Sequence, residues 1–595
     1  MKKLLILMFC STFILSCSKP QRSTLYPDMV ILNGNIITVD KNFSTAEAIA
    51  IKEDKITAVG SNKMIERMAG ISTKRINLEG KTVIPGINDA HTHPEIAIAI
   101  ESKLFDKIPN TRTIKELLNW IEQEAKAKKP NEWIIYPKFF PTRMKELRQP
   151  TIKELDRAAP DNPVFLDGSF AAMINTRALQ ILGISKATNK KGILKDPMTG
   201  ELTGYIQETA FIDGEPTGYV TRTVLGSILK SSEKELSYKE KLDELENMIK
   251  RYNEVGITSF CSAIDEEPGN IRMFIDLKKQ SRLTARVYQH ILVPFDFKIP
   301  EKEIRKNLIR LGLCTGLGDE WVKVGAIKTV NDAGICTGTA YLREPWGLKG
   351  KDIYGIINPN FRGYRYYTKE DLIPLIKVAT ELGWKYTAHC TGGGSVDILL
   401  DAFAEVNKIS PVKGRRHSII HGNFYTQEAV KKMSKLGIYA DSQPAFFFMD
   451  GDAIQYVLGE RRAKTFHPYK SLTDAGVIVN GGSDHMVKFD SYEAINPYNP
   501  FYAMWSVITR KTTWENVITP EEAVSREEAL RMYTINNAYA SFEEDIKGSI
   551  EPGKLADLAV ISENILKCPI DNIKNIKVSM TMVGGKIVYK SDDLN

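Results

Sequence analysis

Two histidines separated by a single residue follow a short apolar segment near the start of the chain. His91 and His93 come directly after residues 82–90, Thr-Val-Ile-Pro-Gly-Ile-Asn-Asp-Ala. In an extended chain, residues i and i+2 point the same way, so both imidazoles can reach one ion. Imidazole is a common ligand of zinc and related metals, although a lone histidine more often has a structural role.

Three further polar residues follow apolar segments later in the chain. His389 and His421 each end such a segment, and Asp484 follows residues 477–482. A divalent ion held by imidazoles and a carboxylate, with one position open to water, is a hydrolytic site. Because four of the eight histidines fall in this ordered set, the set predicts a metal-dependent hydrolase. For the others we expect structural roles: His290, His417, His467 and His485.

The segments that carry these residues alternate between helical and extended patterns. A capping box at 368–371 begins a helix that ends at Leu382-Gly383, and a strand pattern follows. Thr426 begins a second such unit, whose helix ends at Gly437. Repeated helix–Gly–strand units indicate parallel strands with crossover helices. For residues 81–545 we therefore expect an α/β fold, a (β/α)8 TIM barrel with insertions, whose site lies at the carboxyl ends of the strands.

Short β patterns bracket this long middle region. Residues 29–60 have strand patterns with a hairpin signal at Asn33-Gly34, and residues 558–589 have them around a turn at Gly584-Gly585. We therefore expect the barrel to be inserted into one small β-sandwich domain built from both termini, residues 29–80 and 546–595.

The first residues have the pattern of an export signal. Two lysines precede an apolar run too short to span a bilayer, and residues 14–17 resemble a bacterial lipobox in which Cys17 is acylated. A buried N-terminal strand is the alternative. We expect residues 1–16 to be a signal peptide and 17–28 a lipid-anchored tether. The protein would then be an exported bacterial lipoprotein, periplasmic or anchored to the outer membrane, that contacts the membrane only through its lipid.

The composition excludes several other classes of protein. The 595 residues are 43% hydrophobic and 26% charged, which excludes a disordered, collagen-like or multi-span membrane chain. A net charge of +7 without a Lys/Arg cluster does not favour a nucleic-acid partner. The five cysteines after Cys17 are odd in number and dispersed, so we expect no disulfide framework.

The sequence resembles the amidohydrolase superfamily and, within it, family 3, the YtcJ-like branch that includes N-substituted formamide deformylases. The resemblance runs from about residue 29 to 590 and rests most on Pro-Gly-Ile-Asn-Asp-Ala-His-Thr-His at 85–93 and on the tail motif at 548–557. Shorter matching motifs lie at 133–134, 163–166, 175–179, 200–204, Glu208, 327–332 and 529–534.

The resemblance implies a metal site with one or two divalent ions, expected to be zinc. His91 and His93 would bind one ion, and His389 and His421 the second. Lys328 matches the branch's lysine, which carries a carboxylate derived from CO2 and bridges two metals. The sequence itself does not show carboxylation, and a free ammonium would be a poor ligand because it repels a cation.

The resemblance also implies a reaction. Asp484, a metal contact and the catalytic residue, would take a proton during attack of metal-bound hydroxide and return it to the departing amine. The protein would cleave a non-peptide amide or related C–N bond in a small molecule. Two alternatives remain open: a deaminase or cyclic-amide hydrolase on the same metal site, and a catalytically inactive surface-binding lipoprotein.

Three positions depart from the pattern of the branch. Residues 391–394 are Thr-Gly-Gly-Gly instead of Ile-Gly-Asp-Arg, Ile420 replaces a glutamate, and Ser169-Phe170 stands where Gly-His is usual. These changes indicate retained hydrolysis on an altered substrate.

Aromatic residues close to the predicted strand ends are candidates for the lining of an apolar substrate pocket. We expect three of them there, with ordinary core packing as the alternative: Phe446, Phe447 and Trp505.

Overall fold

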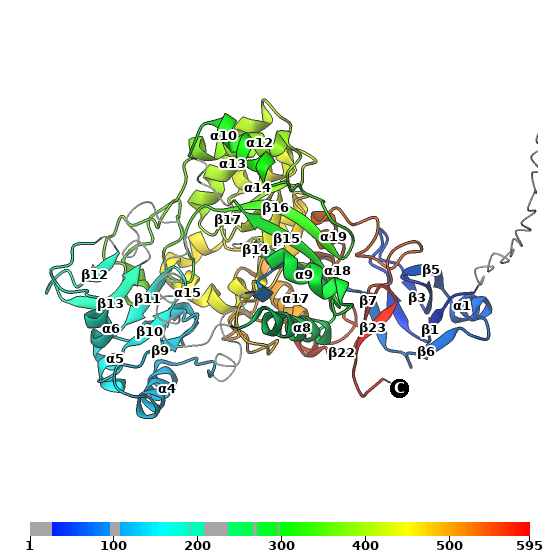
Figure 1. Cartoon of the computed structure of the whole chain (residues 1–595), viewed down its shortest axis with the longest axis horizontal. Helices are drawn as coiled ribbons and strands as arrows, with labels where there is room; N and C mark the ends of the chain where they lie inside the picture. The colour runs from blue at the N-terminus through cyan, green and yellow to red at the C-terminus, as the bar shows by residue number, and fades with distance from the viewer. Residues whose placement is uncertain are drawn as a thin grey trace, which may run out of the picture.

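The computed structural model describes residues 26–95, 108–190, 192–207, 236–265, 270–293, 296 and 298–594. The expected signal peptide, the acylated Cys17 and the motif residue Glu208 lie outside these ranges. Along the long axis of the molecule, a barrel lies between a terminal β domain and a smaller sheet (Figure 1).

Eight parallel strands form the barrel, as the helix–Gly–strand pattern predicts. In spatial order they are β8 (Ile87–Thr92), β14 (Ile257–Asp265), β15 (Arg286–Leu292), β16 (Val322–Val330), β17 (Tyr386–Cys390), β18 (Ser418–His421), β19 (Tyr439–Ser442) and β20 (Val479–Gly481). The barrel closes where the chain after β20 meets β8. There, Thr92 and His485 form a parallel bridge, and the Asp484 amide donates to the His91 carbonyl at 2.6 Å.

Amphipathic helices pack around the barrel. α8 (Tyr238–Glu254) buries Leu242, Leu245 and Ile249, which recur at helical spacing on one face. The predicted capping box begins α12 (Lys369–Glu381), and Gly437 ends α14 (Gln427–Leu436) in the left-handed conformation. The other helices of this part are α9 (Asn270–Lys279), α10 (Glu301–Arg310), α11 (Lys351–Tyr354), α13 (Gly393–Asn407), α15 (Pro444–Ala463), α16 (Tyr469–Asp474), α17 (Pro500–Thr509), α18 (Arg526–Met532) and α19 (Ile535–Ala540).

The terminal domain consists of two sheets that share one core. The four-stranded sheet has the order β5 (Lys55–Gly60), β4 (Ala48–Lys52), β1 (Met29–Leu32), β6 (Lys74–Asn77), with α1 (Asn62–Met68) beside it. The six-stranded sheet has the order β23 (Lys586–Lys590), β22 (Val578–Val583), β21 (Leu558–Ile561), β7 (Thr82–Pro85), β2 (Asn35–Ile37), β3 (Thr45–Ala46). Ile31 and Ile49 of the first sheet pack with Val560 and Met582 of the second, which makes a sandwich from both chain ends.

Two details of this domain differ from the sequence-based expectation. The strands on either side of Asn33-Gly34 do not form a hairpin, because β1 pairs with β4 and β6 whereas β2 pairs with β3 and β7. Asn33 has a φ of 57°, and the chain passes there from one sheet to the other. In addition, β7 was expected in the barrel but pairs with β2 and β21, so this strand belongs to the terminal sandwich.

A third sheet is inserted between the first two barrel strands. Its order is β12 (Ile193–Lys195), β13 (Leu202–Gln207), β11 (Ala171–Ile174), β10 (Val164–Asp167), β9 (Ile134–Tyr136). The helices α4 (Ile114–Ala127), α5 (Ile152–Ala158) and α6 (Thr176–Ile181) accompany it. The sequence indicated insertions in the barrel but not this sheet.

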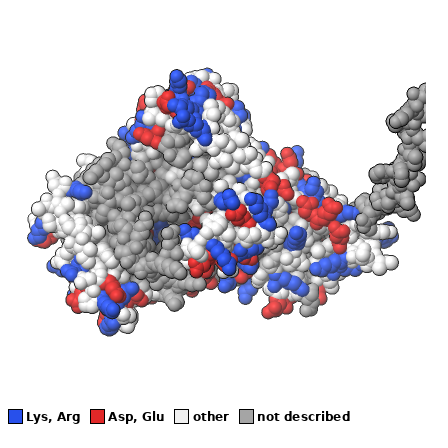
Figure 2. Space-filling model, viewed as in Figure 1, with Lys and Arg blue, Asp and Glu red and all other residues white. Residues whose placement is uncertain are grey.

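The surface of the described residues mixes both signs of charge. On the face drawn in Figure 2, Lys and Arg side chains are interspersed with Asp and Glu. Among the described helices, none combines the length and the apolar character that a membrane span requires.

Tyr252 stabilises the point at which the barrel closes. Its buried hydroxyl lies 2.7 Å from Thr92 Oγ1 and 2.8 Å from His485 Nδ1. Tyr252→Phe is expected to lower the free energy of unfolding by about 1–3 kcal/mol, because it leaves these two buried polar groups without their partner. Chemical denaturation measures the change. Tyr238→Phe is the control, since Tyr238 is exposed and bonds to Asp276 at the surface; an equal effect of both variants would contradict the expectation.

Candidate active site

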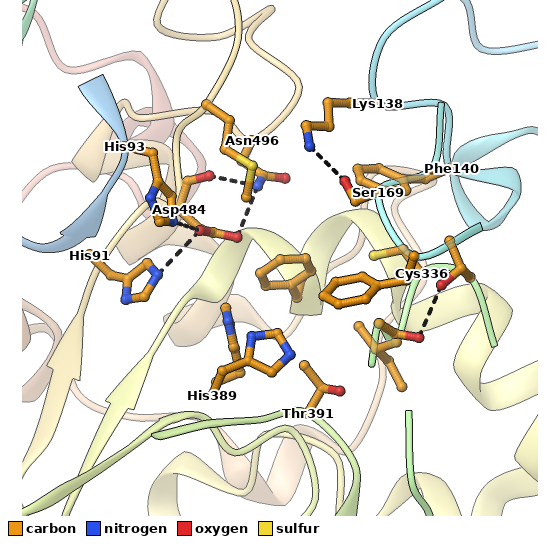
Figure 3. A pocket seen from close by; sticks show the side chains of 18 of the residues that line it. His91, His93, Lys138, Phe140, Ser169, Cys336, His389, Thr391, Asp484 and Asn496 are labelled. Carbon is orange, nitrogen blue, oxygen red and sulfur yellow. Dashed lines mark hydrogen bonds and ion pairs between the residues drawn. The ribbon is translucent and has the colours of Figure 1, made fainter. Parts of the chain in front are cut away.

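One cavity at the carboxyl ends of the barrel strands contains every residue that we expect to bind metal (Figure 3). It is an open cavity, and the empty space inside it, open solvent included, is about 810 Å³. Six of its lining residues are the predicted ligands His91, His93, Lys328, His389, His421 and Asp484. They come from strands 1, 4, 5 and 6 of the barrel and from the loop after strand 8, counted in chain order.

His91, His93 and Asp484 form the tightest group. One potential ligand atom from each lies within 4.8 Å of the others, and all three residues are buried. Asp484 Oδ1 lies 3.3 Å from His91 Nε2 and 3.0 Å from His93 Nε2. The two histidines are adjacent to Asp484 because the barrel closes at this point, where β8 meets the chain after β20.

His389 and His421 lie beside this group. Their ring centroids are 4.5 Å apart, and the ring of His421 is 5.3 Å from that of His91. Strand register places His389 opposite Ile420, and His421, at the end of β18, has a φ of 68°, so its backbone departs there from the regular alternation of a strand. Lys328, on the neighbouring strand β16, is only 1% exposed and lines the same cavity.

Burial and neighbouring charges set the protonation states of these groups. Burial, with a contribution from the Lys328 charge, lowers the pKa of His91 and of His389 to about 3. Both imidazoles are therefore neutral at pH 7, which is the form that binds metal. Burial alone would raise the pKa of Asp484, but its interactions with His91 and His93 hold the pKa well below the usual value, so the carboxylate is ionised.

The donor set fits a divalent metal ion. Among the described residues, the buried atoms His91 Nδ1 and His421 Nδ1 have no hydrogen-bond partner, and Asp484 Oδ1 has only the ion-pair contacts with His91 and His93. Buried polar atoms are normally hydrogen-bonded, so a convergent group of such atoms requires an explanation. Imidazole nitrogens and a carboxylate oxygen are the ligands that zinc prefers.

The other four histidines contact protein groups away from this site. These pairs are His290 with the Ala326 amide, His417 with Thr380, His467 with Asn423, and His485 with Tyr252. Each is buried and lies outside the ligand group.

The structure also places a residue beside Asp484 that the sequence did not indicate. Asn496 Nδ2 donates to the Asp484 backbone carbonyl at 2.7 Å and approaches its Oδ2 at 3.3 Å. The Oδ1 of Asn496 accepts from Arg143 Nη2 at 2.9 Å, which fixes the orientation of the amide. Arg143 is in turn paired with the fully buried Asp450. No local sequence pattern marks this chain of contacts, since it joins the inserted region to the barrel.

Asn496→Ala is expected to lower kcat for an amide substrate by about 10- to 100-fold, the effect of one hydrogen bond to a charged group. The metal content should stay unchanged, because Asn496 contacts the carboxylate rather than the imidazoles. Steady-state kinetics with elemental analysis measures both quantities. Asn496→Gln, which keeps the amide but moves it, provides the comparison. A full loss of metal in Asn496→Ala would show that Asn496 holds the ion site and does not position Asp484.

The aromatic pocket residues that we expected from the sequence are placed differently from one another. Phe446 lines the cavity, with its ring 5.4 Å from that of His421. Phe447 lies under Arg510 at 3.7 Å in the core and does not line this cavity. Trp505 is also buried elsewhere, with Nε1 bonded to Asp571. Successive residues of a helix are about 100° apart, so Phe446 and Phe447 on α15 cannot face the same side.

The glycine run after His389 has a steric reason. A Cβ on Gly392 would lie 2.1 Å from the Tyr341 carbonyl oxygen. The Asp332 carboxylate accepts the amides of Thr391 and Gly392 at 2.8 and 2.7 Å and so holds the start of α13. Of residues 391–394, Thr391 is the one among the lining residues of the cavity, and Gly392 and Gly394 pack against Tyr341.

The fold and the site together define a class of protein. A parallel eight-stranded barrel, with imidazoles and a carboxylate converging at the carboxyl ends of its strands, is typical of metal-dependent hydrolases. The chain belongs to the Amidohydrolase family, whose Amidohydro_3 model matches residues 74–589. It is therefore a metal-dependent amidohydrolase, a hydrolase that acts on carbon–nitrogen bonds.

Known proteins match over nearly the whole length of the chain. It is 28% identical to N-substituted formamide deformylase of Arthrobacter pascens over 95% of this chain and 98% of the relative. It is 26% identical to the putative amidohydrolase YtcJ of Bacillus subtilis, over 94% and 98% of the two chains. The crystal structure of an uncharacterized metal-dependent hydrolase from Pyrococcus horikoshii shares the fold, with a TM-score of 0.64 at 20% identity over 91% and 99% of the chains.

Proposed function

We propose that the protein hydrolyses a non-peptide amide bond in a small molecule, with zinc as its metal. The observation that carries this proposal is the convergence of four imidazoles, Lys328 and Asp484 in one cavity. The similarity to an N-substituted formamide deformylase supports an amide as the bond that is cleaved. The changes at residues 391–394, Ile420 and Ser169 favour a substrate other than that of this relative.

In this proposal the cavity residues divide into two ligand groups. His91 and His93 would hold one ion beside Asp484, and His389 and His421 would hold a second. Once carboxylated by CO2, Lys328 would be an anionic ligand between the two groups. Its ammonium form would repel the metal cations. When bound, the metal would polarise the amide carbonyl and lower the pKa of the attacking water.

Asp484 moves the proton in the proposed reaction. Its carboxylate is ionised, so an Oδ atom can accept a proton from the attacking water and return it to the nitrogen of the departing amine. Asn496 and the two imidazoles fix the orientation of that carboxylate. Phe446, which lies against His421, excludes water from one side of the site and offers apolar surface to the substrate.

Metal content per chain is the experiment that tests this proposal first. Protein beginning at Ser18 is purified without chelator, supplied with bicarbonate and analysed for bound elements, and N-acyl amines are screened in parallel. About two zinc ions per chain, with release of an amine and a carboxylic acid, is the expected result. Release of ammonia would instead indicate a deaminase. A chain that neither contains nor rebinds metal would overturn the proposal in favour of a binding protein.

We also propose that the chain is exported and anchored through an acylated Cys17. The support is the pattern of residues 1–17, which lies outside the described part of the structure. Cells given a labelled fatty acid should yield labelled protein in the membrane fraction. Cys17→Ser should lose the label and leave that fraction. An unlabelled parent protein, or a variant that stays with the membrane, would contradict this proposal.

A further inference from the structure

A lysine that the metal chemistry does not use lies in the wall of the active-site cavity. Lys138 follows β9 of the inserted sheet, is 7% exposed and lines the same cavity as the expected metal ligands. In Figure 3 its ammonium lies across the pocket from His91 and His389. The inserted sheet therefore brings a lysine side chain to the wall of the substrate cavity.

The position of this ammonium is defined by contacts between two loops of the inserted sheet. Lys138 Nζ donates to Ser169 Oγ at 2.6 Å, and the Ser169 amide donates to Asp167 Oδ1 at 2.9 Å. The Phe139 amide joins the loops by donating to the Asp167 carbonyl at 2.6 Å. Ser169 is also one of the positions at which the chain departs from the pattern of its branch.

Both residues have a backbone conformation that side chains other than glycine seldom adopt. The φ angles are 52° for Lys138 and 71° for Ser169. Such conformations cost energy, persist where the surrounding structure imposes them, and cluster at ligand sites. Here they direct two polar side chains toward each other at the edge of the cavity.

The surroundings of Lys138 indicate which chemical groups a ligand in this cavity would carry. The cavity wall near it includes apolar side chains, such as Phe140, Phe170, Ile335 and Met486. A buried lysine is costly to maintain, and its ammonium interacts strongly with an anion in a site of low polarity. A carboxylate that accepts from Lys138 and Ser169 would receive two hydrogen bonds, one of them charge-assisted.

We propose that Lys138 and Ser169 form a subsite for a carboxylate group of the substrate. The substrate is then an acylated amine that carries both an apolar group and a carboxylate, such as an N-acyl amino acid. The subsite holds the carboxylate while the amide lies beside the expected metal ligands of the same cavity. The identity of the cleaved bond rests on the proposed function, whereas the preference for an anion rests on Lys138 and Ser169 alone.

The subsite is tested by the binding of two ligands to the metal-loaded protein, neither of which can be hydrolysed. The first ligand is 4-oxo-5-phenylpentanoate, in which a methylene replaces the amide nitrogen of N-phenylacetylglycine. The second is the same ketone with a hydroxymethyl group in place of the carboxylate. Calorimetry should show that the carboxylate binds about 10- to 100-fold more tightly, the ratio expected for a charge-assisted contact.

Variants at position 138 separate this subsite from carboxylate binding to the metal. Lys138→Met should reduce the ratio of the two affinities at least tenfold and leave the neutral ligand unchanged, which also shows that the variant is folded. Lys138→Arg should keep part of the preference for the carboxylate ligand. Ser169→Ala should reduce the affinity ratio by less than Lys138→Met does. An unchanged ratio in Lys138→Met, equal weakening of both ligands, or no binding of the carboxylate to the parent protein would overturn the proposal.

Hydrolysis of N-phenylacetylglycine, measured in parallel, distinguishes the two proposals. A Lys138-dependent preference for the carboxylate without hydrolysis would establish the subsite and count against amide cleavage. Hydrolysis of neutral N-acyl amines, with no dependence on Lys138, would support amide cleavage and overturn the subsite.

Discussion

Asp484→Asn is expected to lower the turnover of an amide substrate by about 10²–10⁴-fold, the usual contribution of a general acid–base residue. The carboxamide has nearly the same shape, so it fits between His91 and His93, but it cannot accept the proton of the attacking water. Steady-state kinetics on zinc-loaded protein measures the loss. The melting temperature should change little, because the residue is buried in a site whose shape is preserved.

The metal content of the variant decides how the loss is interpreted. If Asp484→Asn retains its zinc, the loss reports proton transfer. If zinc is lost as well, the carboxylate is mainly a ligand, and activity should return in part at high zinc concentration. Asn496→Asp is a useful comparison because it adds a carboxylate next to Asp484 without removing the first one. Full activity of Asp484→Asn would contradict the role given to this residue.

Arg143→Met is expected to lower the free energy of unfolding by about 3–5 kcal/mol, because it leaves a buried carboxylate without its partner. Arg143 Nε and Nη2 lie 3.1 and 3.2 Å from the two carboxylate oxygens of Asp450, whose side chain is fully buried. Arg143 also holds Asn496 and so connects the ion pair to Asp484. Chemical denaturation should therefore show a large loss of stability, together with reduced turnover.

A double variant separates the loss of charge pairing from the loss of packing. Arg143→Met combined with Asp450→Leu removes both charges, and buried pairs replaced by apolar residues are often near neutral in stability. The double variant should thus recover a large part of the stability lost in the single one. Arg272→Met, at an exposed pair with Asp276, should leave the melting temperature unchanged. A single variant as stable as the parent would contradict the importance of the buried pair.

The barrel and the metal ligands could be predicted because their signals are local in the sequence. His91 and His93 share one strand end, and the glycine after each helix marks where a strand begins. The positions of His389, His421 and Asp484 after separate strands are enough to place them at one end of a parallel barrel. The final orientation of each side chain also depends on local backbone conformation, such as the φ of 68° at His421.

The residues that the sequence did not reveal depend on contacts between distant segments. Arg143 and Asn496 are separated by 353 positions, and Lys138 meets Ser169 only because two loops of the inserted sheet are adjacent. The hairpin expected at Asn33-Gly34 was wrong for a similar reason. A favourable turn dipeptide bends the chain, but the partners of each strand are decided by the core between the two sheets.

The position of β7 has a consequence for the order in which the chain can acquire its structure. This strand lies between β2 and β21, so its sheet is incomplete until the last part of the chain is available. Contacts this distant in sequence form slowly, and domains built from early segments alone fold during synthesis more readily. The terminal sandwich is therefore expected to complete its folding only after the C-terminal strands have been made. A newly made chain keeps an open strand edge at β7 until its C-terminal residues arrive to cover it.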